Sequence, residues 1–251
     1  MTELEHLSYS SISLWLSCGR AFSYRYIEHV QVPTAPELIL GSAVHDAVEH
    51  LLTGASDVTS AWSEAWARHA GEEQIAWGDD TPETYYNSGL ALLSSADVQK
   101  ALANIVPAQD EQGPCIERRV ALTVPTVPIP VIGYIDIITQ DGVPADFKTS
   151  ARSWTAEKAQ NELQSLYYLA ALNQMGREMP ELKFRHYVLV KTKTPQFQSL
   201  EHFHRPSELF WLFELIQRAW KGISHDVFPY NPTSWRCSPA FCDYWELCRG
   251  R

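Results

Sequence analysis

The chain has 251 residues, of which 45% are apolar, so it can bury a sizeable core and does not fit the disordered or low-complexity classes. Acids outnumber bases by 30 to 20, and the formal net charge of −10 argues against a protein that coats DNA through a broad basic surface. This charge still allows an enzyme that collects acids around metal ions and binds a polyanion locally.

No stretch approaches the roughly 18 uninterrupted apolar residues of a membrane-spanning helix, so no membrane association is expected. The first six residues, MTELEH, are acidic and lack the basic and then apolar layout of a secretory signal. We therefore expect a cytoplasmic protein, either bacterial or encoded by a phage. In that reducing compartment the five cysteines are not expected to form a disulfide framework.

The first 110 residues are predicted to be mainly helical. A serine followed by apolar side chains at every fourth position predicts a helix over residues 10–27. A second helix is predicted over residues 40–54 and ends at Gly54. Further helices are expected at residues 57–70 and 82–104.

From about residue 114 the spacing of apolar residues changes from a helical to a strand-like period. Five strands are expected, at residues 115–124, 131–139, 143–149, 183–191 and 196–204. Helices are expected at about 154–175, with Ser153 as a cap and Gly176 as a stop, and at 206–223. This order predicts an α/β fold with a central mixed β-sheet flanked by helices. One domain is expected over residues 1–251, with the sheet core at 114–204 and a helix and Cys-rich tail at 205–251.

The segment VIGYIDIITQDGVPADFKTS, residues 131–150, places acids in the most β-prone part of the chain. A three-residue loop at 140–142 would be a type I turn with Gly142 in the left-handed region. With that loop Asp136 faces Asp146, with Cβ atoms roughly 5 Å apart, and Lys148 lies on the same face. A two-residue Asp-Gly loop would instead send the two aspartates to opposite faces, and the apolar pattern fits either loop.

Two ionised carboxylates at that distance repel each other unless a cation lies between them. Magnesium favours oxygen ligands and bridges to phosphate, and a nearby lysine can orient a water molecule or stabilise charge on a phosphate. The three side chains therefore indicate a site for phosphodiester hydrolysis. The alternative is a charged, solvent-exposed face of a hairpin, which an isolated D-x-K on a strand would favour.

The same segment resembles the core of the PD-(D/E)XK nuclease superfamily, and it is most similar to the RecB-type branch, which includes the AddB nuclease domain and the CRISPR adaptation exonucleases. The resemblance implies a restriction-endonuclease-like core. It also implies that Asp136 and Asp146 bind Mg²⁺ or Mn²⁺ and catalyse hydrolysis together with Lys148, with the main-chain carbonyl of Phe147 completing the metal shell.

Three further segments resemble the same family. In LGSAVHDAVEHLL the resemblance implies that His45 adds a metal ligand, and in IERRVALTV that Glu117 is a further acid near the metal. In QSLYYLAAL it implies that Gln164 and Tyr168 position the DNA strand. Each has a plainer interpretation: His45 could pair with Glu49 one turn along the helix, Glu117 could balance the neighbouring arginines, and the other two could form an ordinary polar helix edge.

The tail contains Cys237, Cys242 and Cys248 with the spacing C-x4-C-x5-C. Three thiolates are one short of the four that a tetrahedral zinc site or a cubane iron–sulfur cluster needs. Cys18 is the best remaining candidate for the fourth, because Cys115 lies on a predicted strand and is expected to pack as a small apolar residue.

One cysteine near the start and three near the end of the chain resemble the iron–sulfur subgroup of RecB-like nucleases. The resemblance implies a [4Fe-4S] cluster bound by Cys18, Cys237, Cys242 and Cys248, although the first gap in the tail has four residues where many members have two. Zinc is the alternative. Such a cluster would close a very long loop and act as a structural crosslink without redox chemistry.

Together with this resemblance, the sequence predicts a stand-alone, Mg- or Mn-dependent deoxyribonuclease that acts as an exonuclease on DNA ends or single strands. No helicase phosphate-binding motif is present. A protein partner in recombination or CRISPR adaptation, and self-association, are both compatible with this interpretation. The alternatives are a DNA-binding protein of the same fold that does not cleave, and a zinc-stabilised α/β protein unrelated to nucleases. Candidate phosphate contacts are Arg152, Lys158 and Lys191.

Overall fold

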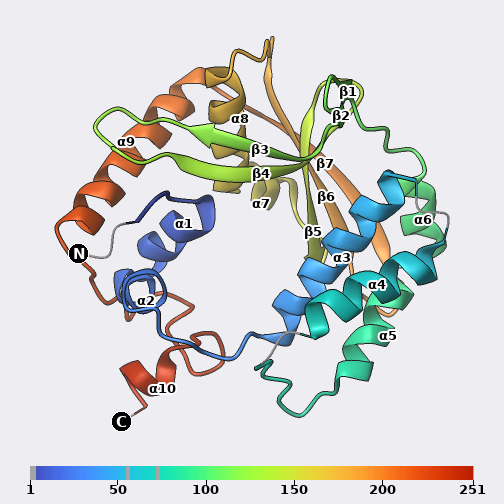
Figure 1. Ribbon diagram of the computed structural model, residues 1–251, viewed down its shortest axis with the longest axis horizontal. Helices are drawn as coiled ribbons and strands as arrows, with labels where there is room; N and C mark the ends of the chain where they lie inside the picture. The colour runs from blue at the N-terminus through green and yellow to red at the C-terminus, as the bar shows by residue number, and fades with distance from the viewer. Residues whose placement is uncertain (1–3, 55–56, 72–73, 251) are drawn as a thin grey trace.

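The computed structural model describes residues 4–54, 57–71 and 74–250, so the expected domain limits at residues 1 and 251 lie outside the described residues. Figure 1 shows a sheet with helices on both sides. Within the described ranges, no helix combines the length and the apolar character needed to cross a bilayer.

The sheet has the strand order β3-β4-β5-β6-β7. Only β5 and β6 pair in parallel, and the other neighbours are antiparallel. This mixed sheet flanked by helices confirms the predicted fold class. The strands are β3 (Ile116–Leu122), β4 (Val131–Ile138), β5 (Pro144–Ser150), β6 (Leu182–Val190) and β7 (Gln196–His204), and a small separate ribbon is formed by β1 (Gln109–Asp110) and β2 (Gly113–Pro114).

The β4–β5 hairpin has the register of the three-residue loop. Ile137 pairs with Ala145, and Gly142 has a φ of +82°, as the type I turn requires. The ladder ends at Ile137, however, so Asp136 and Asp146 are not a ladder pair as expected. Beyond this point β3 and β4 run across the molecule, away from β5, β6 and β7 (Figure 1). The sheet therefore forks immediately beside the two acids.

Because the sheet forks, residues on the same face of β4 pack into two different cores. Alternation along a strand places Ile135 and Ile137 on one face, but Ile135 packs with α8 and α9 whereas Ile137 packs with Phe147 and the helices of the other layer. Figure 1 shows that layer on the right, formed by α3 (Pro36–Leu52), α4 (Val58–Ala70), α5 (Pro82–Leu93) and α6 (Ala96–Leu102). The opposite layer contains α1 (Tyr9–Ser17), α7 (Ala156–Gln160), α8 (Leu163–Gln174) and α9 (Pro206–Ser224).

Two of the expected long helices are each divided in two. Residues 82–104 form α5 and α6 because the Ser95 side chain accepts a hydrogen bond from the Val98 N–H and so begins a new helix. Residues 154–175 form α7 and α8, and Thr155 caps α7 in place of the expected Ser153. Apolar spacing continues through both breaks, which is why periodicity alone did not detect them.

The expected helix over residues 10–27 is broken at Cys18, which has an extended backbone (φ −164°, ψ 106°). It is followed by α2 (Gly19–Phe22) and a π-helical turn, η1 (Ser23–Ile27). The tail packs into this break: the Arg20 N–H donates to the Pro229 carbonyl at 3.2 Å, and Asn231 Nδ2 donates to the Ser17 carbonyl at 3.0 Å. The break therefore presents Cys18 to the tail, which ends in α10 (Trp245–Cys248).

We expect the substitution Gly19→Ala to destabilise the protein by about 1–3 kcal/mol, as overpacking does elsewhere. A Cβ at this position would lie 2.5 Å from Pro229 Cδ and 2.7 Å from the Pro229 nitrogen, which are parts of the tail that cannot easily move. Gly41→Ala is the control, because nothing lies within 4 Å of a Cβ there, and in a helix interior it should stabilise by about 0.5–1 kcal/mol. Urea denaturation measures both. Equal stabilities would contradict the docking of the tail.

Candidate active site

The two acids lie at the fork between β4 and β5. Asp146 is fully buried, and Asp136 Oδ2 accepts a hydrogen bond from the Phe147 N–H at 2.6 Å. The N–H and C=O of a strand residue point to the same edge of the strand, so the Phe147 carbonyl also faces the gap that β4 leaves. The Phe147 ring points away from this gap, into the core beneath α3.

His45 reaches the same place from the middle of α3. Its Nδ1 lies 3.5 Å from Asp136 Oδ2. Within the described residues His45 and Glu49 form no ion pair, so the structure does not support the interpretation that His45 only pairs with Glu49. Burial lowers the pKa of His45 to about 4, against the opposing charge of Asp146. The imidazole is therefore neutral at pH 7, which is the form that binds metals.

Lys148 joins Asp146 to the polar edge of α8. Its Nζ lies 2.6 Å from Asp146 Oδ2 and donates to Gln164 Oε1 at 2.6 Å. Gln164 Nε2 donates to the Tyr168 hydroxyl at 2.7 Å, and that hydroxyl donates to the Tyr134 carbonyl at 2.5 Å. Burial acts to lower the pKa of Lys148, but Asp146 and Asp136 outweigh it, so the pKa is raised and the side chain is a cation. Gln164 and Tyr168 thus fix the position of this cation.

Glu117 lies on β3, opposite Asp136 in the strand register. Its φ of +47° is in the left-handed region, which costs a residue with a Cβ about 1–2 kcal/mol. Burial raises the pKa of Glu117 to about 7, helped by Asp136 and then Glu49. The neighbouring Arg118 pairs with Asp110 at 2.6 Å and not with Glu117. Glu117 therefore adds to the negative charge around the fork.

The carboxylates at the fork exceed the positive charge available to them. Burial raises the pKa of Asp136 to about 6 and that of Asp146 to about 6, although Lys148 opposes both shifts. Such a group of carboxylate oxygens, with a neutral imidazole and a main-chain carbonyl beside them, suits a hard divalent cation such as Mg²⁺ or Mn²⁺. In the described ranges no three His, Cys, Asp or Glu side chains already converge closely enough to hold one ion. Lys148 instead holds Asp146, and the Phe147 N–H holds Asp136.

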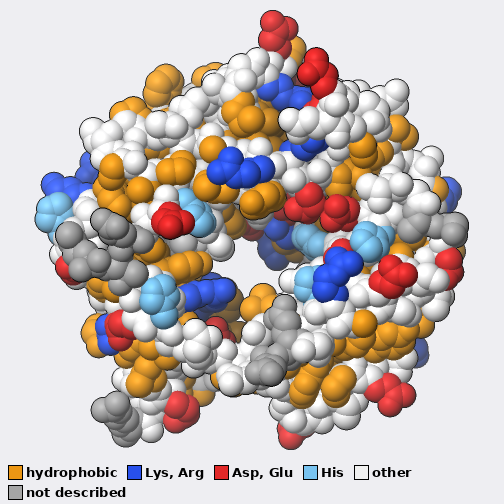
Figure 2. All heavy atoms as spheres, in the orientation of Figure 1, with side chains coloured by type: hydrophobic (Ala, Val, Ile, Leu, Met, Phe, Trp, Pro, Cys, Tyr) orange, Lys and Arg blue, Asp and Glu red, His pale blue; other side chains and the backbone are white. Residues whose placement is uncertain are grey.

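Two hollows meet at the fork. One, of about 930 Å³, lies between α3, α4 and the end of β5, and the other, of about 390 Å³, lies beside β4 and α8. His45 and Glu117 line both. Figure 2 shows an opening at the centre of this face, with histidines, acids and bases on its rim. Of the three expected phosphate contacts, Lys191 lines the larger hollow, whereas Arg152 and Lys158 line neither.

Sequence reasoning missed a charged network in the larger hollow. The Asp46 carboxylate lies 2.6 Å from Arg68, 3.3 Å from His69 and 3.5 Å from His50. The four-residue spacing of Asp46 and His50 is visible in the sequence, but their contacts with α4 depend on how two helices pack. The network places Arg68 on the wall of the hollow, beside the fork.

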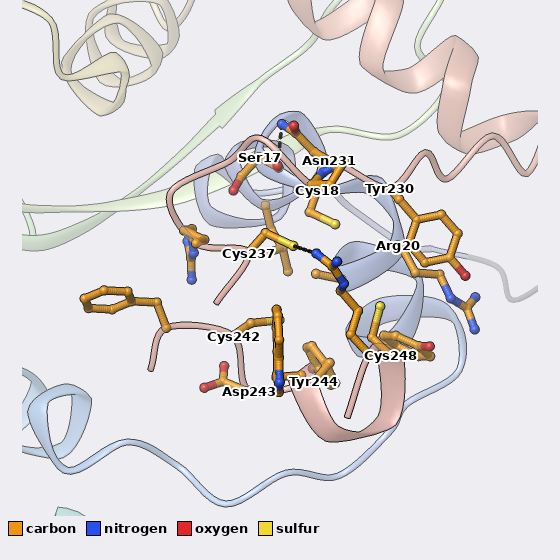
Figure 3. A pocket seen from close by; sticks show the side chains of 18 of the residues that line it. Ser17, Cys18, Arg20, Tyr230, Asn231, Cys237, Cys242, Asp243, Tyr244 and Cys248 are labelled. Atoms are coloured by element: carbon orange, nitrogen blue, oxygen red, sulfur yellow. Dashed lines mark hydrogen bonds between the residues drawn. The ribbon is translucent and has the colours of Figure 1, made fainter. Parts of the chain in front are cut away.

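The four cysteines that were expected to bind one group line a single cavity of about 270 Å³ (Figure 3), and all four are free thiols. Burial raises the pKa of Cys242, and its neighbours Cys18 and Cys248 raise it further. Arg249 Nη1 approaches Cys237 Sγ at 3.8 Å. Cys115 is buried elsewhere and donates to Asp110 Oδ2 at 3.3 Å, as expected of a residue outside this set.

Comparisons with known proteins place this arrangement in a family. The structure is similar to the crystal structure of a proposed exonuclease from Eubacterium rectale, with a TM-score of 0.65, 10% identity, and coverage of 98% of this chain and 88% of that one. At 10% identity, this similarity shows only that the two proteins share a fold. The crystal structure of SSO0001 matches with a TM-score of only 0.36 at 13% identity, covering 96% of this chain and 95% of that one. The comparison with curated proteins finds no significant match.

The sequence profile of the PD-(D/E)XK nuclease superfamily matches residues 6–249, which is nearly the whole chain. The match spans the forked sheet, α3, α8 and the three cysteines of the tail. The chain belongs to the PD-(D/E)XK nuclease superfamily.

Proposed function

We propose that this protein is a metal-dependent deoxyribonuclease that hydrolyses phosphodiester bonds at the fork between β4 and β5. The observation that carries the proposal is the meeting of Asp136, Asp146 and Lys148 beside His45, from two strands and a helix. A bound Mg²⁺ or Mn²⁺ would supply Lewis acidity and lower the pKa of a water molecule. Asp136, Asp146, His45 and the Phe147 carbonyl would hold it, with Glu117 nearby.

The chain's own residues define the rest of the chemistry. Lys148 is a cation at neutral pH, and it would orient the attacking water or stabilise charge that develops on the phosphate. The hydrogen bonds from Lys148 through Gln164 to Tyr168 keep the ammonium at the fork. Gln164 and Tyr168 also line the smaller hollow, where they would contact the DNA strand.

We infer that the enzyme acts on DNA ends. Two hollows lie on either side of His45 and Glu117, and Figure 2 shows an opening at the same face. A strand that passes through an opening must enter by a free end, so this shape favours an exonuclease. The resemblance of the chain's motifs favours the RecB-type branch. The likeness to a proposed exonuclease supports the same assignment.

We also propose that Cys18, Cys237, Cys242 and Cys248 hold a structural [4Fe-4S] cluster. The four thiols come from both ends of the chain and surround one cavity. A cubane cluster needs four such ligands, and so does a tetrahedral zinc ion, which is the alternative. The resemblance of this cysteine layout to the iron–sulfur subgroup of RecB-like nucleases favours the cluster. Free cysteines also suit the reducing cytoplasm that we propose as the protein's location.

Lys148→Ala should lower the rate of cleavage of end-labelled linear DNA in Mn²⁺ by about 10²–10³-fold, because it removes a preorganised positive charge from the phosphate. Lys221→Ala, an exposed lysine on α9, is the control and should cleave normally. Circular single strands should resist the wild type. If neither the wild type nor Lys148→Ala cleaves the DNA, a protein that binds DNA without cutting it is favoured instead. Rapid cleavage of circular strands would contradict the requirement for a DNA end.

Affinity for Mn²⁺ should fall by at least about tenfold between pH 7.5 and pH 5. The reason is that the pKa of Asp136 and that of Asp146 are each raised to about 6, so protons compete with the metal below that pH. Titration calorimetry at the two pH values measures the change. Asp136→Asn should bind weakly at both, whereas Glu214→Gln, on the exposed face of α9, should behave as wild type. A constant affinity across this range would refute the site.

Protein prepared without oxygen should be coloured and contain iron, and Cys242→Ala should lose both. It should also lose about 2–4 kcal/mol of stability, by analogy with removal of a native crosslink. Cys115→Ala is the matched control, since Cys115 lies outside the cavity, and it should keep the colour. Colourless wild-type protein that contains zinc would exclude the iron–sulfur assignment.

A further inference from the structure

Two aromatic side chains of the tail face solvent close to the cysteine cavity. Trp235 is 73% exposed and Phe241 is 58% exposed, and their ring centres lie 5.3 Å apart at an angle of 70°. Neither ring contributes to a buried core cluster of the described residues. Soluble proteins rarely leave adjacent large rings uncovered unless they bind something.

The position of Phe241 follows from the spacing of the tail cysteines. Four residues separate Cys237 from Cys242. Phe241 is the last of these four. The Cys242 N–H donates to the Ser238 carbonyl at 3.0 Å, so the gap closes as a turn and leaves the Phe241 ring outside it. The segment between the two cysteines therefore carries an exposed ring beside the cysteine cavity.

Positive charge gathers around the same cavity in a chain whose net charge is −10. Four arginines line the cavity against one acid, Asp243. Arg20 pairs with Glu28 at 2.5 Å, and Arg249 is directed to the Cys237 thiol. The other two form no ion pair among the described residues, and each has an aromatic ring nearby. Arg236 lies 5.8 Å from the ring centre of Trp235, and Arg25 lies 5.7 Å from that of Tyr26.

We propose that Trp235, Phe241, Arg25 and Arg236, hereafter the tail platform, bind single-stranded DNA away from the fork. Aromatic rings stack with any base and arginines neutralise phosphates, so the pairing of the two suits a single strand with little sequence preference. Figure 1 places the tail across the molecule from the sheet, on the other side of the opening seen in Figure 2. A strand held there would be guided toward the opening. The inference deepens the proposed nuclease function and rests on it.

The test measures binding without cleavage. The probes are a fluorescein-labelled thymidine 30-mer and an abasic strand of the same length and charge, titrated with metal-free protein and followed by anisotropy. Trp235→Ala and Phe241→Ala should each weaken binding of the thymidine strand by roughly tenfold, the usual effect of losing one stacked base. They should leave binding of the abasic strand unchanged. Trp235→Phe should restore most of the affinity, whereas Trp235→Leu should not.

Two further variants distinguish base stacking at the tail platform from a general effect of exposed rings or of charge. Phe210→Ala removes a ring that is 77% exposed on α9, and it should bind both strands as wild type does. Arg236→Gln should weaken both strands alike and lower the slope of log K against log salt by about one. Both results would support contact of the ring with bases and of the guanidinium with phosphate.

Several outcomes would overturn the tail platform. Equal loss on the thymidine and abasic strands in Trp235→Ala would show that the ring acts through the fold or the charge and not through bases. No loss on either strand would show that the rings serve another surface, such as a protein contact. The two proposals can fail separately. If the wild type does not cleave DNA but Trp235→Ala still weakens binding of the thymidine strand, the tail platform stands and only the proposed nuclease activity is refuted.

Discussion

The hydrogen bond from the Phe147 N–H to Asp136 Oδ2 is the interaction on which the candidate site depends. A buried N–H without a partner costs free energy, and Phe147 loses its ladder partner where β4 leaves β5. The Asp136 carboxylate takes the place of that partner, so the sheet can fork without leaving the donor unpaired. The same departure creates the gap into which His45 and the Phe147 carbonyl are directed. The geometry of the strand and the position of the acid are therefore one feature, and a change in either disturbs the other.

The start of the chain connects this fork to the cysteine cavity. The Leu7 N–H donates to the Pro130 carbonyl and the Ile132 N–H donates to the Leu7 carbonyl, so the segment before α1 extends the sheet beside β4. From the other end of α1, Cys18 turns toward the tail. The Tyr9 hydroxyl donates to Glu162, just before α8 and its Gln164. A crosslink through Cys18 would hold α1 in place, and α1 in turn contacts both elements that bear the site. This path explains how loss of the cysteines would reduce activity without any part in hydrolysis.

Turn chemistry and strand alternation are local signals, and they left two registers open for the hairpin. Only the three-residue loop brings Asp136, Asp146 and Lys148 to one face, and the structure has the register of that loop. The fork was not predictable, since residues 131–138 are strand-like throughout and only tertiary packing ends their pairing with β5. The left-handed backbone of Glu117 has no sequence signal at a non-glycine residue. The break at Cys18 depends on a tail more than two hundred residues away, and the contacts of Asp46 depend on helix packing. Periodicity detects none of these.

The negative charge at the fork allows the proposed binding of DNA at the tail and its cleavage at the fork to depend differently on metal. Asp136, Asp146 and Glu117 bring three carboxyl groups to the fork against the one ammonium of Lys148, so a phosphate is repelled from the fork until a cation is bound. Burial raises the pKa of each of the three carboxyl groups. The arginines of the tail lie in the opposite environment, with one acid among the residues of their cavity. A strand can therefore be held at the tail in the absence of metal, whereas its phosphate enters the fork only after the acids are neutralised. If both proposals hold, metal controls the cutting step and has little effect on the initial capture of the strand, and the two steps are carried by surfaces of opposite charge within one small protein.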